Sequence, residues 1–180
     1  MEKKKKIWII GHYTMPPEYE VRIKTLMWAK YLIQAGYDVT LISASTLHNT
    51  DINLISGKEP YVFKQYDEYK FIHIRCNTYR GHGYRRVKNL FEFVNKFKKY
   101  AKQFGELPDV ILAADIHCVN YKPIGKFAKK NDIKIIVDIR DLWPESIIEY
   151  LGFSKKNPVI KYLYHQERNM YKIADAIVFS

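Results

Sequence analysis

The sequence predicts a single α/β domain in which a parallel β-sheet is covered by helices on both faces. Two observations support this fold class. Apolar, strand-like runs alternate with helical patterns along the 180 residues, as in proteins built from βαβ units. Residues 133–139, IKIIVDI, are also β-branched and almost continuously apolar, which is typical of a central strand buried on both faces. A chain of this length forms one domain of ordinary size.

The first forty residues predict a βαβ unit. Residues 5–11, KKIWIIG, are typical of a short buried strand. The Pro16–Pro17 pair prevents a helix from starting much before Glu18. The helix that follows is expected to end at Gly36, and YDVTLIS at 37–43 then forms the second strand. The crossover between these two parallel strands is expected to be right-handed.

The same alternation of strands and helices continues to the last residue. Further strands are expected at 69–76, 109–114, 133–139 and 174–180, and helices at 84–104, 121–130 and 157–173, with a shorter helical turn before Gly152. Residues 44–68 are expected to be irregular, and 77–84 to form a polar loop.

The chain is strongly basic, with 30 Lys and Arg against 19 Asp and Glu and a formal net charge of +11. This balance favours anionic partners such as nucleic acid, phospholipid headgroups or phosphorylated small molecules. The helix at 84–104 is basic and amphipathic. Its expected apolar stripe consists of Val87, Leu90, Phe91, Val94, Phe97 and Ala101, and its cations on the other faces are Arg85, Arg86, Lys88, Lys96, Lys98, Lys99 and Lys102. Such a helix either packs on the core with a solvated back or contacts a membrane or a phosphate group.

Missing motifs exclude several kinds of chemistry. The sequence has neither a GxGxxG after the first strand nor a GxxxxGK[ST], so the glycines that cradle phosphates in dinucleotide and P-loop sites are absent. No GxSxG elbow is present, and His, Asp and Glu are not clustered at metal-ligand spacing, so we expect no metal. Cys76 and Cys118 lack CxxC companions, which argues against a disulfide framework and indicates a reducing compartment.

Polar loops are expected at the edge of the sheet where the parallel strands end, and ligands of open α/β sheets bind there. These loops are 12–22, 76–84, 115–120 and 140–146. The last follows the buried strand and, with Asp138, places three carboxylates, a guanidinium and an indole within nine residues, DIRDLWPES. This cluster is either a functional site or an ion-paired loop in which Trp143 caps the core and Glu145 starts a helix.

Several motifs together resemble the amino-terminal half of a family-4, GT-B glycosyltransferase, of the kind that builds bacterial capsule or O-antigen repeat units. They are HYTMPPE, the spacing of Arg22, Leu26, Leu32 and Gly36, YDVTLIS, PDVILA, VDIRDLWPES and ADAIVFS, of which DIRDLWPES is the most specific. The resemblance spans essentially the whole chain. It implies that residues 1–180 form a Rossmann-like, acceptor-side domain. It also implies a C-terminal donor-binding domain that is absent here, so the chain alone is expected to be inactive.

The resemblance also implies roles for particular residues. Asp141, after the fifth strand, would be catalytic, either as a base or as a hydrogen-bond acceptor that orients the acceptor sugar. The expected substrate-binding residues are His12, Glu18, Arg22, Arg80, Arg140 and Glu145. Arg22 would pair with Glu18 or with an acceptor phosphate, and His12 and Glu18 either contact the acceptor or stabilise their own loop. Tyr19 and Glu20 stand where many members have Gly-Gly, which argues against donor-phosphate contact by this loop.

The expected activity is transfer of a sugar from a nucleotide-sugar, implied to be UDP-linked, to a glycolipid or polysaccharide-precursor acceptor, with no cofactor. The expected location is cytoplasmic, peripheral on the anionic inner face of the plasma membrane, because the chain has no apolar run long enough to span a bilayer. The alternative is a non-catalytic module that binds a polyanion such as nucleic acid. It is the weaker hypothesis, since the cations are spread over several elements and no nucleic-acid motif occurs.

Overall fold

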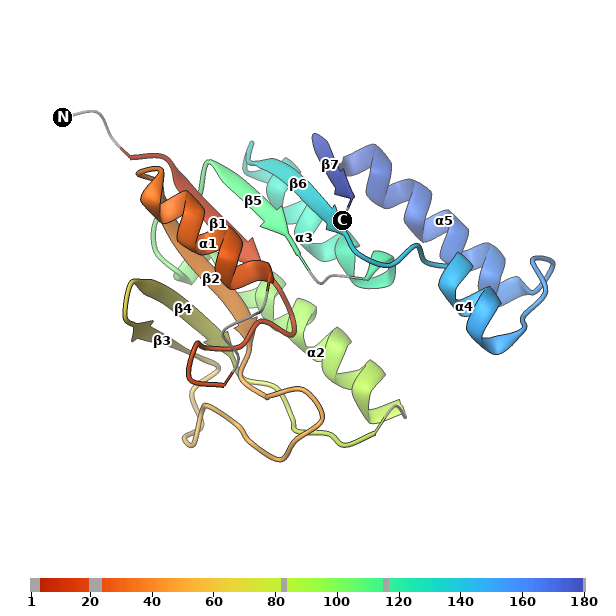
Figure 1. Cartoon of the computed structure of the whole chain (residues 1–180), viewed down its shortest axis with the longest axis horizontal. Helices are drawn as coiled ribbons and strands as arrows, with labels where there is room; N and C mark the ends of the chain where they lie inside the picture. The colour runs from red at the N-terminus through yellow and green to blue at the C-terminus, as the bar shows by residue number, and fades with distance from the viewer. Residues whose placement is uncertain (1–3, 20–23, 82–83, 115–116, 180) are drawn as a thin grey trace.

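The computed structural model describes residues 4–19, 24–81, 84–114 and 117–179. Within these ranges, seven strands form one sheet in the order β3-β4-β2-β1-β5-β6-β7 (Figure 1). The strands are β1 (Lys6–Ile10), β2 (Asp38–Ala44), β3 (Tyr61–Tyr66), β4 (Tyr69–Ile74), β5 (Val110–Ala113), β6 (Lys134–Ile139) and β7 (Ala176–Phe179). The helices are α1 (Lys24–Gln34), α2 (Tyr84–Tyr100), α3 (Cys118–Lys130), α4 (Glu145–Leu151) and α5 (Pro158–Ile173), and a 3-10 turn, η1 (Ala101–Gln103), follows α2.

The sheet confirms the expected fold class, because every paired strand is parallel to its neighbour except β3. β3 was not expected, since 44–68 was predicted to be irregular. It pairs antiparallel with β4 across a tight turn at Asp67, whose φ of 48° an Asp tolerates. Lys64 and Gln65 interrupt the apolar pattern of this exposed edge strand, so no two-residue periodicity marks it in the sequence.

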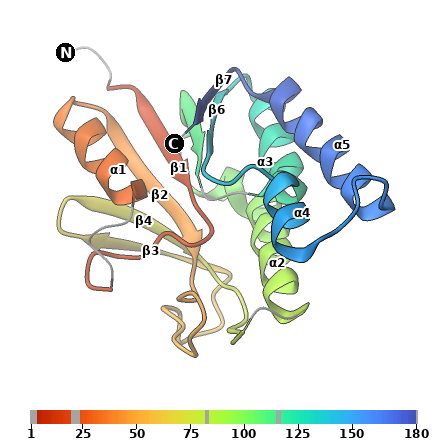
Figure 2. The ribbon, with the colours of Figure 1, turned by 45° about the vertical axis from the view of Figure 1, so that its right-hand side comes forward.

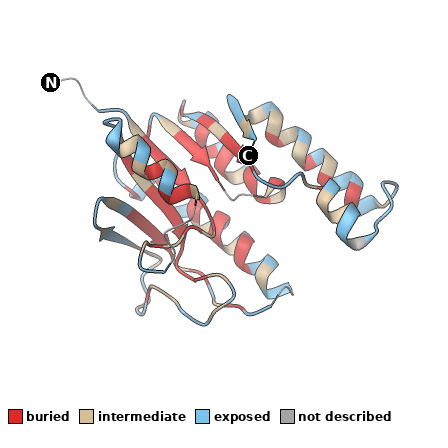
Figure 3. Ribbon diagram, viewed as in Figure 1, coloured by how far each residue is buried: buried red, intermediate tan, exposed pale blue. Residues whose placement is uncertain are grey.

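Helices lie on both faces of the sheet, as predicted (Figure 2). On one face, Leu26 and Ala29 of α1 pack against Ile9 and the neighbouring strands. On the other, α2 and α3 bury large side chains such as Phe93 and Tyr121 against the central strands. The buried residues therefore concentrate on the central strands and on the inner sides of the helices (Figure 3).

α5 packs against α3 (Figure 1). Gly125 of α3 lies against α5. A Cβ built at this glycine would lie 2.8 Å from Cγ2 of Ile173 in α5 and 3.0 Å from the ring of Tyr121. The glycine therefore allows the two helices to approach more closely than any larger residue would.

The buried face of α2 differs from the predicted stripe. Phe93 is fully buried, whereas Val87 and Phe91 are 50% and 42% exposed. Asn89 occupies a buried position because its amide hydrogen-bonds to groups beneath the helix. Because Asn89 is buried, the side of α2 that faces the core is rotated about the helix axis relative to the apolar stripe predicted from the sequence. Arg86 consequently lies half-buried and not on the solvated side of the helix.

Two helix boundaries also differ from the prediction. Residues 17–19 form a turn, so Glu18 does not start α1; residues 20–23 lie outside the described ranges. α3 begins at Cys118, three residues before the predicted start, and continues through Pro123. None of the described helices is both long enough and apolar enough to cross a membrane.

Candidate functional site

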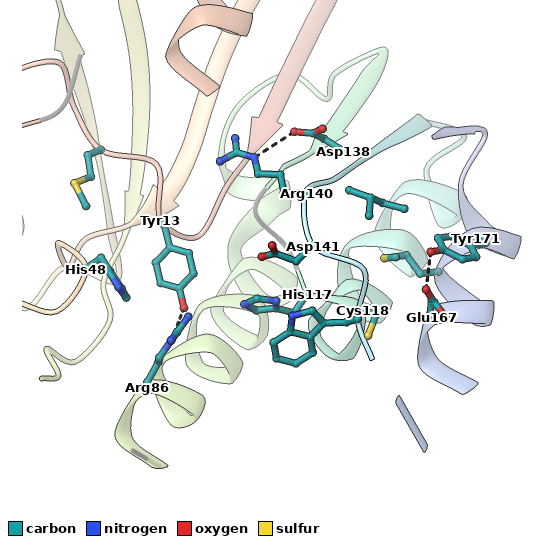
Figure 4. Close-up of a pocket in the computed structure, with 14 residues that line it drawn as sticks. Tyr13, His48, Arg86, His117, Cys118, Asp138, Arg140, Asp141, Glu167 and Tyr171 are labelled. Carbon is teal, nitrogen blue, oxygen red and sulfur yellow. Dashed lines mark hydrogen bonds and ion pairs between the residues drawn. The ribbon is translucent and has the colours of Figure 1, made fainter. Parts of the chain in front are cut away.

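A cleft of about 450 Å³ opens at the carboxyl ends of β1, β5 and β6 (Figure 4). β1 lies between β2 and β5, so the chain connections diverge at this point of the sheet, and ligands of open α/β sheets bind at such a switch point. The lining residues are Tyr13, Met15, His48, Arg86, His117, Cys118, Asp138, Ile139, Arg140, Asp141, Trp143, Glu167, Met170 and Tyr171. Of the seven predicted site residues, Arg140 and Asp141 are among them.

Tyr13 and Arg86 form one wall of the cleft. Nε of Arg86 donates a hydrogen bond of 2.9 Å to the Tyr13 hydroxyl, and the guanidinium lies 5.5 Å from the centre of the Tyr13 ring. The edge of the Tyr13 ring also meets His48, at 4.8 Å between ring centres. These contacts join the loop after β1 to α2, and they restrict the orientation of the Arg86 side chain.

His12 lies behind this wall and does not line the cleft. Its Nε2 is 2.5 Å from Oδ1 of Asn89, whose Nδ2 donates to Thr46 and to the backbone of Asn77. Because these donations fix the amide with its oxygen toward His12, the proton of His12 resides on Nε2. Burial lowers the pKa of His12 to about 3, so the ring is neutral and supports Tyr13 through an edge contact.

His117 stands immediately before α3 and stacks at a tilt on Trp143, with 4.4 Å between the ring centres. Burial, followed by the charge of Arg86, lowers its pKa to about 4, while the charge of Asp141 acts in the opposite direction. His117 is therefore neutral near neutral pH and lies within the electrostatic reach of both groups. The loop 115–120 was expected at the site, but no feature of the sequence singled out this histidine.

Asp138 holds the end of β6 in place. Its side chain is fully buried and accepts a hydrogen bond of 2.7 Å from Nζ of Lys24 in α1. Nε of Arg140 lies 3.5 Å from its other oxygen. A buried carboxylate is stable only when paired, so the two cations fix both the strand end and the direction of Arg140.

Asp141 is exposed at the cleft and is the carboxylate that the sequence predicted to be catalytic. Among the described residues, its side chain makes no hydrogen bond or ion pair, whereas Asp138 makes both. Trp143, which was considered as a cap on the core, also lines the cleft. Asp141 is therefore positioned to accept a hydrogen bond from a ligand hydroxyl next to an aromatic surface.

Three of the other predicted site residues lie elsewhere. Glu18 is exposed in the turn at 17–19, and Arg80 forms an ion pair with Asp51 on a surface loop. Glu145 starts α4 and accepts a hydrogen bond of 2.6 Å from the Tyr164 hydroxyl. Arg22 lies outside the described residues. The cleft thus brings together Arg140 and Asp141 but not Glu18, Arg80 or Glu145.

The far end of the cleft is formed by α3 and α5. The Tyr171 hydroxyl donates a hydrogen bond of 2.7 Å to Glu167, and the buried Cys118 thiol, whose pKa burial raises to about 11, lies at the start of α3. No pattern in the sequence indicated Glu167 as a site residue. Within the described ranges, no group of three or more His, Cys, Asp or Glu side chains is arranged to hold a metal ion.

The fold is similar to that of a solved glycosyltransferase structure. A structure of sucrose-phosphate synthase from Thermosynechococcus elongatus, a GT-B glycosyltransferase, superposes with a TM-score of 0.58 at 12% sequence identity, covering 98% of this chain and 76% of that one. A probable GTP-binding protein matches with a TM-score of 0.33 at 13% identity, over 97% and 87% of the two chains, which is too low to indicate a shared fold. No family model and no curated protein matches the sequence. The chain therefore has a GT-B-like, Rossmann-like fold.

We predict that the protein loses stability as the pH falls from about 6.5 toward 4. Burial lowers the pKa of His12 and His73 to about 3 and that of His117 to about 4, from 6.5. Below pH 6.5 the unfolded chain therefore binds more protons than the folded chain. The free energy of unfolding should fall by up to about 1.4 kcal/mol per pH unit for each of these histidines.

Guanidinium unfolding at a series of pH values, in wild type and in His117→Gln, measures this dependence. Carboxylates titrate in both proteins and cancel in the difference between them. The variant should lose the share of the slope that His117 contributes. An identical pH dependence in the two proteins would contradict a buried, neutral His117.

Proposed function

We propose that this chain is the acceptor-binding half of a glycosyltransferase that transfers a sugar from a nucleotide-sugar to a hydroxyl group of a glycolipid or polysaccharide precursor. The observation that carries the proposal is the Asp141 carboxylate, presented in a cleft at the switch point of a sheet with a GT-B-like fold. The cleft volume lies within the range of about 300–1,000 Å³ typical of small-molecule sites.

The geometry suits an acceptor hydroxyl beside Asp141. The carboxylate accepts the hydrogen bond of that hydroxyl, which orients its oxygen toward the donor and favours loss of its proton as the new bond forms. Trp143 and Tyr13 supply aromatic surface on which the less polar face of a sugar ring packs. The neutral His117 beside Asp141 offers a further hydrogen-bonding partner.

The finer assignment rests on the sequence motif VDIRDLWPES. By this resemblance we propose a family-4 enzyme of the capsule or O-antigen type, with a UDP-linked donor bound by a second, C-terminal domain. Tyr19 and Glu20, in place of Gly-Gly, support a donor held mainly outside this loop. A polyanion-binding module is not favoured, because the cleft combines its cations with the acids Asp141 and Glu167.

Asp141→Asn should lower turnover by about a hundredfold to ten-thousandfold, because an amide cannot take up the proton of the acceptor hydroxyl. Turnover is measured as the release of nucleotide from the nucleotide-sugar, in the protein together with the proposed donor domain. Asp132→Asn is the matched control, since Asp132 is exposed at the opposite end of β6 and its φ of 55° suits Asn. Equal rates in Asp141→Asn and wild type would rule out the catalytic role.

We further propose that the outer face of α2 rests on the anionic inner face of the plasma membrane. Tyr84, Val87 and Phe91 are 74%, 50% and 42% exposed, at a spacing that places them on one side of the helix. Arg85 and Lys88 flank them and are also exposed. Apolar side chains edged by cations match the charge and depth of an anionic bilayer surface.

The charge-reversed variant Arg85→Glu/Lys88→Glu should bind anionic phosphatidylglycerol vesicles at least about 30-fold more weakly than wild type, since each cation near such a surface contributes about 1 kcal/mol. Co-sedimentation at low salt measures this. The control variant Lys126→Glu/Lys130→Glu changes the net charge by the same amount, but on α3, and should lose less vesicle affinity than Arg85→Glu/Lys88→Glu. Absence of wild-type binding, or equal losses in both variants, would refute the docking surface.

A further inference from the structure

The end of the cleft opposite Arg86 combines one acidic side chain with an otherwise apolar wall (Figure 4). This end lies between the start of α3, the last residue of β6 and α5. Its buried apolar side chains are Cys118, Ile139 and Met170. Glu167 and Tyr171 of α5 line the same end. A ligand that enters this end therefore meets a carboxylate in surroundings of low polarity.

The Glu167 carboxylate is oriented but keeps capacity for a ligand. The Tyr171 hydroxyl, one helical turn away, donates a hydrogen bond of 2.7 Å to its Oε1. Among the described residues, no side chain donates to Oε2 and no Lys, Arg or His forms an ion pair with this carboxylate. A carboxylate has about four acceptor positions, so several stay open. A charge in apolar surroundings is most stable when paired, so a cationic ligand group fits here.

The negative charge of Glu167 acts across this end of the cleft. Burial, followed by the charge of Glu167, raises the pKa of the Cys118 thiol to about 11. Burial, followed by the hydrogen bond to Glu167, also raises the pKa of the Tyr171 hydroxyl. The thiol and the hydroxyl are therefore neutral near neutral pH. Glu167 is the source of negative potential beside them.

Aromatic side chains complete the surroundings of the carboxylate. Trp143 lines the cleft and is packed at a tilt on His117, with 4.4 Å between the ring centres. The indole of Trp143 and the phenol of Tyr171 can attract an ammonium group that lies within about 6 Å of a ring centre. His117 adds no competing positive charge, because its pKa is lowered to about 4 by burial and by the charge of Arg86.

We propose that Glu167 determines which acceptor is accepted, by forming an ion pair with a protonated amino group on the sugar whose hydroxyl reaches Asp141. Because this inference rests on the proposed acceptor role of the cleft, it names a feature of the acceptor rather than a separate activity. An ammonium group offers three N–H donors and a full positive charge to the carboxylate. A hydroxyl or an acetamido group offers one donor and no charge.

NMR titrations of the ¹⁵N-labelled chain with three methyl glycosides test this specificity. The probes are methyl glucosaminide, methyl glucoside and methyl N-acetylglucosaminide, and the galactose series repeats the comparison for the other ring configuration. Slightly acidic buffer keeps the amine protonated. Wild type should bind the amine about 10- to 100-fold more tightly than either neutral analogue in at least one series, as expected for a charge-assisted contact.

Variants locate the amine within the cleft. Glu167→Gln keeps an oxygen that accepts the Tyr171 hydrogen bond, and it should bind all three glycosides with the weak affinity of the neutral ones. Glu149→Gln is the matched control, because it removes the same charge from an exposed position of α4 and should keep the preference for the amine. Asp141→Asn should weaken the three glycosides alike and also keep the preference.

Equal binding of the amine and the neutral analogues by wild type in both series, or no saturable binding of any glycoside, would overturn the inference. So would a preference that is lost in Asp141→Asn but kept in Glu167→Gln. Equal losses in Glu167→Gln and Glu149→Gln would indicate a diffuse charge effect and overturn it as well. If the amine preference is found without any sugar transfer, the proposed function fails and the amine site stands. Sugar transfer without an amine preference has the opposite consequence.

Discussion

The buried carboxylate of Asp138 sets the geometry of the cleft. Lys24 and Arg140 neutralise it, and this pairing ties the end of β6 to α1. Because side chains alternate along a strand, Asp138 faces α1 while Ile139 faces the core beneath α2 and α3. Asp141 lies two residues beyond the end of β6 and lines the cleft, where its charge acts on His117. The ion pairs with Lys24 and Arg140 therefore make Asp138 the structural carboxylate, and Asp141 is the carboxylate presented to the cleft.

Most of the sheet could be predicted from the sequence, because the central strands are fully buried and appear as apolar runs such as IKIIVDI. β3 could not, since its exposed edge position removes the hydrophobic signal. In the site, the ends of the strands indicated where Arg140 and Asp141 would lie. Arg86 and Glu167 could not be found, because helical periodicity does not reveal which polar side chain turns inward once a buried residue such as Asn89 shifts the helix.

α2 connects the three parts of the functional proposal. Its inner face completes the core through Phe93 and Phe97, its first turn carries Arg86 into the cleft, and its outer face exposes Tyr84 and Val87. A lipid-linked sugar acceptor would meet the outer face of α2 with its lipid and the cleft with its sugar. The proposed donor-binding domain would complete an active site at the sheet edge where this cleft opens.

The proposed function requires this cleft to bind a sugar acceptor. A titration of the ¹⁵N-labelled chain with a sugar 1-phosphate, followed by heteronuclear NMR, measures this binding. We expect saturable shifts that concentrate at the cleft, namely at the amides of Tyr13, Arg86, Cys118 and Asp141 and at the Trp143 indole. Shifts confined to the exposed lysines of α2 and α3, or no saturable shifts at all, would contradict it.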